Sequence, residues 1–184
     1  MRIRRGVSGS GPLLDRAGIE EVFRRLGDRL AKRGVVADIY VFGGAAMALA
    51  YDARRATRDV DAVFKPHGIV LEEAHAVGAE LGLPPWWLNE QASSYVAPGG
   101  DPSASRVFDH PGLRVFAASP EHLLAMKALA ARPRDAQDIR ELAKLLDLHS
   151  AADVLALVRD IFPEEQPPAR LRLLLEDIFT DEGS

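Results

Sequence analysis

The chain has 184 residues, of which 47% are hydrophobic and 27% are charged, a composition typical of a globular protein and not of a disordered one. The absence of cysteine excludes a disulfide scaffold, thiol catalysis and cysteine-ligated metal sites. No apolar run approaches the length of about 18 residues that spans a membrane, and no apolar signal core follows the first residues, so we expect a soluble, cytoplasmic protein with no membrane contact.

Helical and strand patterns alternate in the first half of the chain. Apolar residues recur at helical spacing after Asp15, whose carboxylate can cap a helix. A β-branched and aromatic run then ends at two glycines, and a later segment alternates polar and apolar residues as a half-buried strand does. The expected elements are a helix from Asp15 to about Arg33, a strand over 35–42, a short helix over 45–51, a strand over 59–64 and a helix over 69–81.

The second half is mostly helical. An irregular stretch over 84–102 precedes two short strands near 106–108 and 113–117, joined by a turn. Ser119 followed by proline and an acid predicts a helix start. Three further helices are expected, beginning near Asp135, at Ser150 and near Ala169. The pattern predicts an α+β fold, with a small mixed sheet and flanking helices over 1–118 (a loose arm at 1–12) and a helical part over 119–184 packed on the same core.

Charge is distributed unevenly along the chain. Residues 1–33 carry nine basic and four acidic residues, although the net charge of the whole chain is −4. A basic amino-terminal face could attract RNA phosphates, although helices often carry such charge only for solubility.

Two features between residues 40 and 65 suggest phosphate and metal chemistry. Glycines directly after a strand, here Gly43 and Gly44, allow close approach to a phosphate, and the N–H groups of the following helix favour negative charge. Asp59 and Asp61 are one residue apart, so on a strand their carboxylates share a face, where they suit Mg²⁺ held together with a triphosphate. Neighbouring basic residues could bind phosphates: Arg54, Arg55 and Arg58.

The order of these motifs resembles the nucleotidyltransferase superfamily of DNA polymerase β type. More narrowly it resembles the AbiEii-like and MenT-like branch, the toxins of abortive-infection and type IV toxin–antitoxin systems. The resemblance extends over about residues 35–145. Its motifs are Gly43-Gly44, Arg55-x-Thr57-Arg58-Asp59-Val60-Asp61, the helical segment 123–127 ending in Lys127, and Arg132-Pro133-Arg134-Asp135.

The resemblance implies a role for each motif. Asp59 and Asp61 would hold Mg²⁺ and activate the acceptor hydroxyl, and Asp135 would complete the catalytic set together with Lys127. The nucleotide-binding residues would be Gly43, Gly44, Thr57, Arg58 and Lys127.

Each of these residues also has a purely structural interpretation. Gly-Gly is usually a turn, and an Asp-x-Asp strand usually a solvated face. Lys127 could be a surface lysine whose stem packs on apolar neighbours, Asp135 a helix N-cap, and Asp138 a first-turn acid. Many superfamily members have a third metal carboxylate on a later strand, for which Asp109 is the nearest candidate here, although it is as well placed for a turn.

The resemblance implies a Mg²⁺-dependent enzyme that transfers a nucleoside monophosphate from an NTP to a hydroxyl. The acceptor would be RNA, in particular a tRNA 3′ end, and the protein would be a toxin restrained by an antitoxin protein. Alternatives are an antibiotic or small-molecule nucleotidyltransferase, a non-catalytic nucleotide-binding regulatory module, and a structural partner. Trp86-Trp87 could stack a base, or could pack at the edge of a core.

Overall fold

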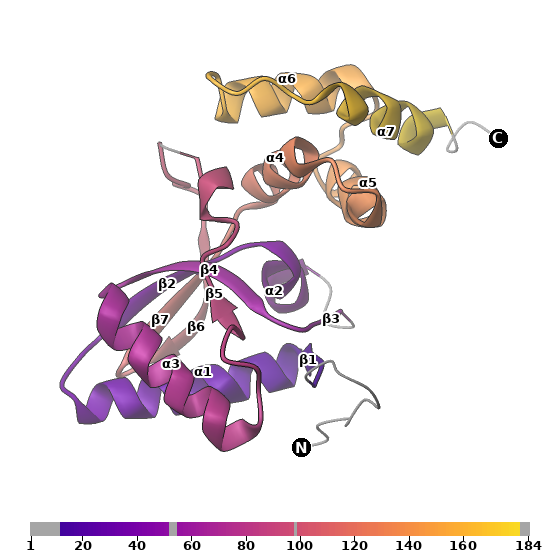
Figure 1. The fold of residues 1–184 in the computed structure, drawn as a ribbon. Helices are drawn as coiled ribbons and strands as arrows, with labels where there is room; N and C mark the ends of the chain where they lie inside the picture. Colours follow the sequence, from indigo (N-terminus) through magenta and orange to yellow (C-terminus); the bar gives the residue numbers. More distant parts are fainter. Residues whose placement is uncertain (1–11, 52–54, 98, 181–184) are drawn as a thin grey trace. The chain divides into compact units, whose positions relative to one another are not determined.

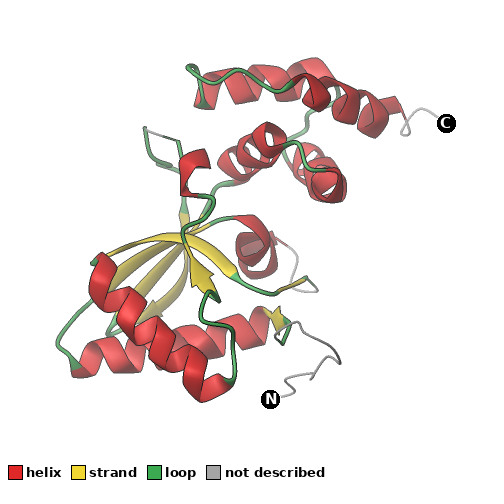
Figure 2. Cartoon of the chain, viewed as in Figure 1, coloured by secondary structure: helices red, strands yellow, loops and turns green. Residues whose placement is uncertain are grey.

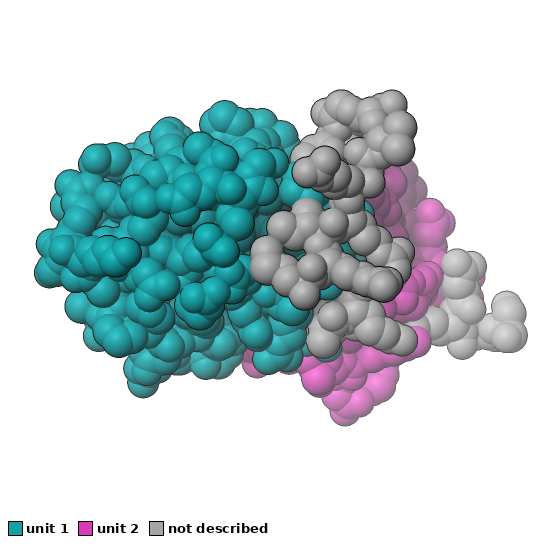
Figure 3. All heavy atoms as spheres, turned by 90° about the horizontal axis from the view of Figure 1, so that it is seen from below, with its two compact units in different colours: residues 1–93, 104–118 teal, residues 94–103, 119–184 magenta. Residues whose placement is uncertain are grey.

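The computed structural model describes residues 12–51, 55–97 and 99–180 (Figure 1). The chain forms two compact units, the first of residues 1–93 and 104–118, the second of residues 94–103 and 119–184 (Figure 3). Arg54 and most of the expected amino-terminal arm lie outside the described residues. No helix in the described ranges has both the length and the apolar character that crossing a bilayer requires.

Unit 1 contains a mixed five-stranded sheet (Figure 2). In spatial order its strands are β5 (Leu88–Asn89), β4 (Val60–Lys65), β2 (Ala37–Val41), β7 (Leu113–Ala117) and β6 (Ser105–His110). β2 runs antiparallel to β4 and parallel to β7, while β4 is parallel to β5 and β6 antiparallel to β7. A separate antiparallel pair is formed by β1 (Leu14–Asp15) and β3 (Ala56–Thr57). The mixed sheet confirms the α+β prediction.

Two helices, α1 (Arg16–Lys32) and α3 (His67–Leu81), pack side by side in unit 1 (Figure 1). The Asp15 carboxylate accepts the Gly18 N–H at 2.8 Å, which confirms the expected cap of α1. The apolar stripe of α1 is buried: Ile19, Val22, Phe23, Leu26 and Leu30. α1 lies so near the β6–β7 turn that a side-chain carbon on Gly112 would collide with the backbone oxygen of Gly27.

The two faces of the sheet differ in what covers them. Phe23 of α1 contacts the ring of Phe108 on β6, with ring centres 5.8 Å apart, so Phe108 marks the face covered by α1. Directly paired residues share a face, and the pairs Phe108–Val115, Val115–Ile39 and Ile39–Phe64 extend this face across the sheet to β4. Residues that alternate with these point to the opposite face and are only half-buried: Tyr40, Asp61 and Val63.

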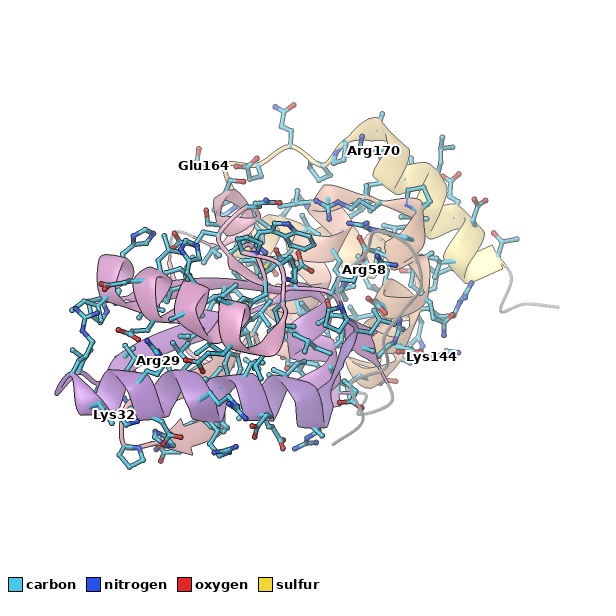
Figure 4. All side chains as sticks on the ribbon, turned by 60° about the horizontal axis from the view of Figure 1, so that its bottom comes forward. Arg29, Lys32, Arg58, Lys144, Glu164 and Arg170 are labelled. Carbon is cyan, nitrogen blue, oxygen red and sulfur yellow. The ribbon has the colours of Figure 1, made fainter. Side chains whose placement is uncertain are left out.

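The basic residues of α1 are largely neutralised by acids of unit 1. Arg29 and Arg33 both contact Glu73 of α3, at 2.6 and 2.8 Å, and Figure 4 shows Arg29 between the two helices. The other paired arginines bind acids of their own helix: Arg16, Arg24 and Arg25. Because these charges are paired, α1 gives little support to RNA attraction by the amino-terminal segment.

Unit 2 is mostly helical over the residues that the structure describes. Its α-helices are α4 (Pro120–Ala130), α5 (Ala136–Leu145), α6 (Ala151–Ile161) and α7 (Ala169–Thr180). The Ser119 and Ser150 hydroxyls accept N–H groups at the starts of α4 and α6, as the sequence predicts. α4 packs against α5 and α6, so its side chains are buried almost all round.

Several expected bounds were wrong. The short helix over 45–51 is an α-helix, α2 (Gly43–Ala46), that continues as a π-helix, η1 (Met47–Tyr51). The stretch over 84–102 contains the strand β5, and the expected turn after 108 is partly strand, since β6 extends to His110. β5 is defined by its pairing with β4, which is distant in the chain, and the end of β6 by its pairing with β7 across the following turn.

Candidate functional site

The two glycines after β2 lie against the segment that carries the paired aspartates. Gly43 has a φ of +60°, a conformation that favours glycine, and a side-chain carbon there would lie 3.0 Å from Asp61 Oδ2. A side-chain carbon on Gly44 would lie 3.0 Å from Thr57 Oγ1. The absence of side chains on these glycines therefore lets α2 begin next to Thr57 and Asp61.

Asp59 and Asp61 are positioned by different contacts. Asp61 lies on β4, and its carbonyl oxygen accepts the Phe42 N–H at 3.1 Å, which holds the end of β2 beside it. Asp59 lies in a bend just before β4, where the Thr57 hydroxyl donates to its carbonyl oxygen at 2.9 Å. The strand predicted over 59–64 thus begins one residue later than predicted. Of the two aspartates, only Asp61 lies on the strand.

Asn89 contacts the Asp59 carboxylate and was not predicted. It is 8% exposed, and its amide nitrogen donates to Asp59 Oδ2 at 3.2 Å and to the Trp86 carbonyl oxygen at 3.3 Å. Its amide oxygen accepts the Gln91 N–H at 3.0 Å. On the parallel strands β4 and β5, Asn89 is the register partner of Asp61. Asn89 therefore lies beside both acids and holds the Asp59 carboxylate in place.

The donor set fits a magnesium ion that is shared with a substrate. Mg²⁺ prefers oxygen ligands and is usually held by one or two carboxylates together with substrate phosphates and water. Asp61 supplies a carboxylate beside the glycine turn. The Asn89 amide donates to the Asp59 carboxylate, and Asn89 is the register partner of Asp61. Among the described residues, no group of three His, Cys, Asp or Glu side chains is placed to hold a metal ion. A magnesium ion held by Asp59 and Asp61 would take its remaining ligands from substrate oxygens and water.

The expected third carboxylate, Asp109, does not join these acids. It lies on β6, at the opposite edge of the sheet from β5 and three strands from β4, with 63% of its side chain exposed. Its carboxylate accepts from Arg106 at 3.1 Å. Asp109 was a wrong candidate because β6, the strand that carries it, is separated from β4 by β2 and β7.

Unit 2 holds the remaining predicted residues in a buried ion cluster. Lys127 on α4 is 7% exposed, and its ammonium lies 2.8 Å from Asp135 Oδ1 and 2.7 Å from Asp138 Oδ2. The surface interpretation of Lys127 is therefore wrong. Asp135 precedes α5 but makes no side-chain cap bond, and its carboxylate binds Lys127 instead. The cluster fastens α4 to the start of α5, with two carboxylates compensating one ammonium.

The other basic residues near the paired acids are only partly described. Arg58 is exposed in the bend that also contains Asp59, and Figure 4 labels its position. Arg55 is half-buried. The structure therefore brings together Gly43, Gly44, Thr57, Asp59 and Asp61 in unit 1, and Lys127 with Asp135 in unit 2.

The glycine turn after β2 lies against Asp61 of β4 in a small mixed sheet. Residues 19–159 match the model of a protein family described as nucleotidyltransferase of unknown function (DUF6036). The chain belongs to this family. No curated protein and no solved structure matches it. The match to the DUF6036 nucleotidyltransferases begins within α1 of unit 1 and ends within α6 of unit 2.

Proposed function

We propose that the protein transfers a nucleoside monophosphate from an NTP to a hydroxyl group and releases pyrophosphate, with Mg²⁺ as cofactor. The observation that carries this proposal is the contact of Gly43 with Asp61 and of Gly44 with Thr57. It brings a backbone turn suited to phosphates next to carboxylates suited to the metal. Membership of a nucleotidyltransferase family supports the reaction class.

Each residue of the site has a separate role in the proposed reaction. The Gly43-Gly44 turn accommodates the triphosphate because no side chain blocks the backbone there. Asp59 and Asp61 hold Mg²⁺, which supplies neutralisation of the charge that develops on the transferred phosphoryl group. Asn89 fixes the Asp59 carboxylate, so that this acid is already oriented when substrate binds. Arg58, exposed beside the acids, is available to the triphosphate.

The role of the buried cluster in unit 2 is a separate part of the proposal. The resemblance implies that Lys127 contacts the triphosphate and that Asp135 completes the active site. In the structure the Lys127 ammonium is held by Asp135 and Asp138, so a phosphate that it contacts would either join these carboxylates or replace one of them. Asp135 would then act as the residue that orients Lys127 between turnovers.

We further propose RNA as the acceptor, in particular a tRNA 3′ end, and a growth-arresting role restrained by an antitoxin protein. This part rests on the resemblance to the AbiEii-like and MenT-like toxins. Induced expression is expected to arrest growth with wild-type protein and not with Asp61→Asn. Growth arrest by both proteins would contradict a toxin that acts through nucleotide transfer.

The test of the reaction uses purified protein, Mg²⁺ and each α-labelled NTP, with tRNA, total RNA or no acceptor. Asp59→Asn and Asp61→Asn are expected to lower incorporation of label by roughly 100-fold or more, because they remove charge from the metal site. Asp38→Asn is the matched control. Asp38 lies on β2 in the same sheet, but its carboxylate pairs with Arg114 at 2.7 Å. Equal incorporation by all four proteins would refute the assignment.

A non-catalytic nucleotide-binding module is the second candidate, favoured by the neutral Asn89 beside Asp61. It predicts that Mg²⁺–NTP raises the melting temperature of wild type, while no acceptor RNA or small hydroxylated molecule becomes labelled. Labelling of an aminoglycoside-type small molecule in place of RNA would instead indicate an antibiotic-modifying enzyme.

A further inference from the structure

A pocket of about 330 Å³ lies where α3 meets β5, the last strand of the sheet. Its volume is at the lower end of the range of about 300–1,000 Å³ found for ligand pockets, which suits a small planar group. The lining combines rings, apolar groups and polar groups: Phe64, Leu71, Trp86, His67, Asn89 and Glu90. All of these residues belong to unit 1.

The structure separates the two adjacent tryptophans into different roles. Trp87 is fully buried, its indole N–H donates to the Ala74 carbonyl oxygen at 2.7 Å, and its ring closes against Gly78 of α3. Trp87 is therefore a packing residue. Trp86 is 47% exposed and lines the pocket, the only aromatic residue among the exposed large hydrophobic side chains that the structure describes. Its indole offers a π surface to a ligand.

The remaining lining provides a second ring surface and a polar edge. The rings of Phe64 and His67 are stacked, with centres 5.3 Å apart and an interplanar angle of 13°. His67 Nε2 lies 2.6 Å from Glu90 Oε2, which fixes the imidazole at the rim. Flat ring surfaces with hydrogen-bonding groups at the edge are the features by which proteins bind unstacked nucleobases.

Asn89 connects this pocket to the paired aspartates. It lines the pocket, and its amide nitrogen donates to Asp59 Oδ2 at 3.2 Å. Phe64 faces the helix-covered side of β4, whereas Asp61 points to the other side. Asn89, the register partner of Asp61, shares the face of Asp61, so the pocket spans the β5 edge of the sheet, from the helix-covered face to the face of the Gly43-Gly44 turn. This arrangement suits two substrates that approach one catalytic centre from different sides.

We propose that this pocket binds a nucleobase of the acceptor RNA, stacked on Trp86, while the NTP occupies the glycine-turn face. The inference rests on the proposed function. It adds a binding subsite whose residues lie outside the motifs of the sequence, and it assigns Asn89 a position between the acceptor pocket and Asp59.

Binding can be measured without catalysis. A short labelled single-stranded oligoribonucleotide is titrated into Mg²⁺-free protein, and both its anisotropy and the tryptophan fluorescence are recorded. The chain has two tryptophans, so quenching present in wild type and absent in Trp86→Phe reports on Trp86. Trp86→Ala is expected to weaken binding roughly 5- to 150-fold, the loss of one stacked base, while Trp86→Phe retains most of it. Val36→Ala, at a similarly exposed apolar side chain of unit 1, is the control.

Three outcomes would contradict the assignment of this pocket to a base of the acceptor RNA. Oligoribonucleotide affinity unchanged in Trp86→Ala shows that no base stacks there, and so does the same quenching in wild type and Trp86→Phe. Quenching by NTP alone at lower concentration than by the oligoribonucleotide assigns the pocket to the donor nucleotide instead.

Steady-state transfer separates this inference from the proposed function. Trp86→Ala is expected to raise KM for the acceptor RNA and leave KM for NTP unchanged. Asp59→Asn is expected to lower kcat and keep oligoribonucleotide affinity. If wild type transfers nucleotide but Trp86→Ala has an unchanged KM for RNA, the pocket assignment alone fails. If wild type transfers nothing, the proposed function fails, and with it the acceptor role of the pocket.

Discussion

Replacing Glu73 by glutamine tests whether the ion cluster between α1 and α3 stabilises unit 1. The Glu73 side chain is 8% exposed and contacts Arg29 and Arg33, whose side chains are 36% and 38% exposed. Breaking a fully buried pair costs about 3–5 kcal/mol, and an exposed pair contributes about 0–1 kcal/mol. Because the arginines can rehydrate, we expect Glu73→Gln to lower the free energy of unfolding by about 2 kcal/mol. This corresponds to about 4–8 °C in Tm for a chain of this size.

Glu72→Gln is the matched control. Glu72 also pairs with Arg33, at 2.9 Å, but is 66% exposed, so its replacement is expected to cost less than about 0.5 kcal/mol. Urea unfolding at pH 7 measures both variants. Equal losses for Glu72→Gln and Glu73→Gln would refute the argument from burial.

The same variants predict a dependence on pH. The hydrogen bond from Arg33, supported by Arg29 and opposed by burial, lowers the pKa of Glu73 below its ordinary value of 4.5. A lowered pKa in the folded state means that this stabilisation is complete above the ordinary pKa and is lost as the pH falls through the folded value. The difference between wild type and Glu73→Gln is therefore expected to be full at pH 7 and to shrink below about pH 4.5. A constant difference from pH 7 down to acid unfolding would contradict a charge effect.

Three further substitutions test the close contacts and the buried cluster. Gly43→Ala is expected to lower the free energy of unfolding by about 1–2 kcal/mol, because Gly43 has a left-handed backbone conformation. It is also expected to reduce the rise in Tm that Mg²⁺–NTP causes. The same rise in Tm as in wild type would show that the turn does not bind phosphate. Lys127→Met leaves buried carboxylates uncompensated and is expected to cost about 3 kcal/mol in urea unfolding, with partial recovery when Asp138→Asn is added. In Gly112→Ala the added methyl group would collide with α1, so this variant is expected to lose at least about 2 kcal/mol in the same assay. Gly68→Ala is the control: Gly68 lies in open space within α3, so this variant is expected to be neutral or more stable by up to about 1 kcal/mol.

Local signals in the sequence predicted the helices well because the groups that begin a helix are neighbours in the chain. Asp15, Ser119 and Ser150 all cap the helices expected after them. β5 was missed because it is two residues long and follows two prolines, and its formation depends on pairing with β4. A strand of this kind is stabilised by its partner and leaves no periodic pattern of its own.

The candidate site was predictable in its motifs and not in the side chains that connect them. The resemblance named Gly43 and Asp61, which the structure places in contact. Asn89 lies 30 residues from Asp59 in the chain, and a single asparagine in an irregular stretch gives no signal. Asp109 was suggested by its residue type. The order of the strands in the sheet places it away from the site, and only the pairing of the strands reveals that order.

The assignment of residues 94–103 to the helical unit affects the order in which the protein can fold during synthesis. The Asp101 side chain is 2% exposed and accepts the Ser119 N–H at 2.7 Å, next to the start of α4. These residues are synthesised before β6 and β7, yet their partners in α4 emerge only after both strands. The contacts of this segment with α4 therefore cannot form until β6 and β7 have been synthesised. A fragment that starts at Ser119 would lack Asp101, so the helical unit cannot be obtained by a single cut of the chain.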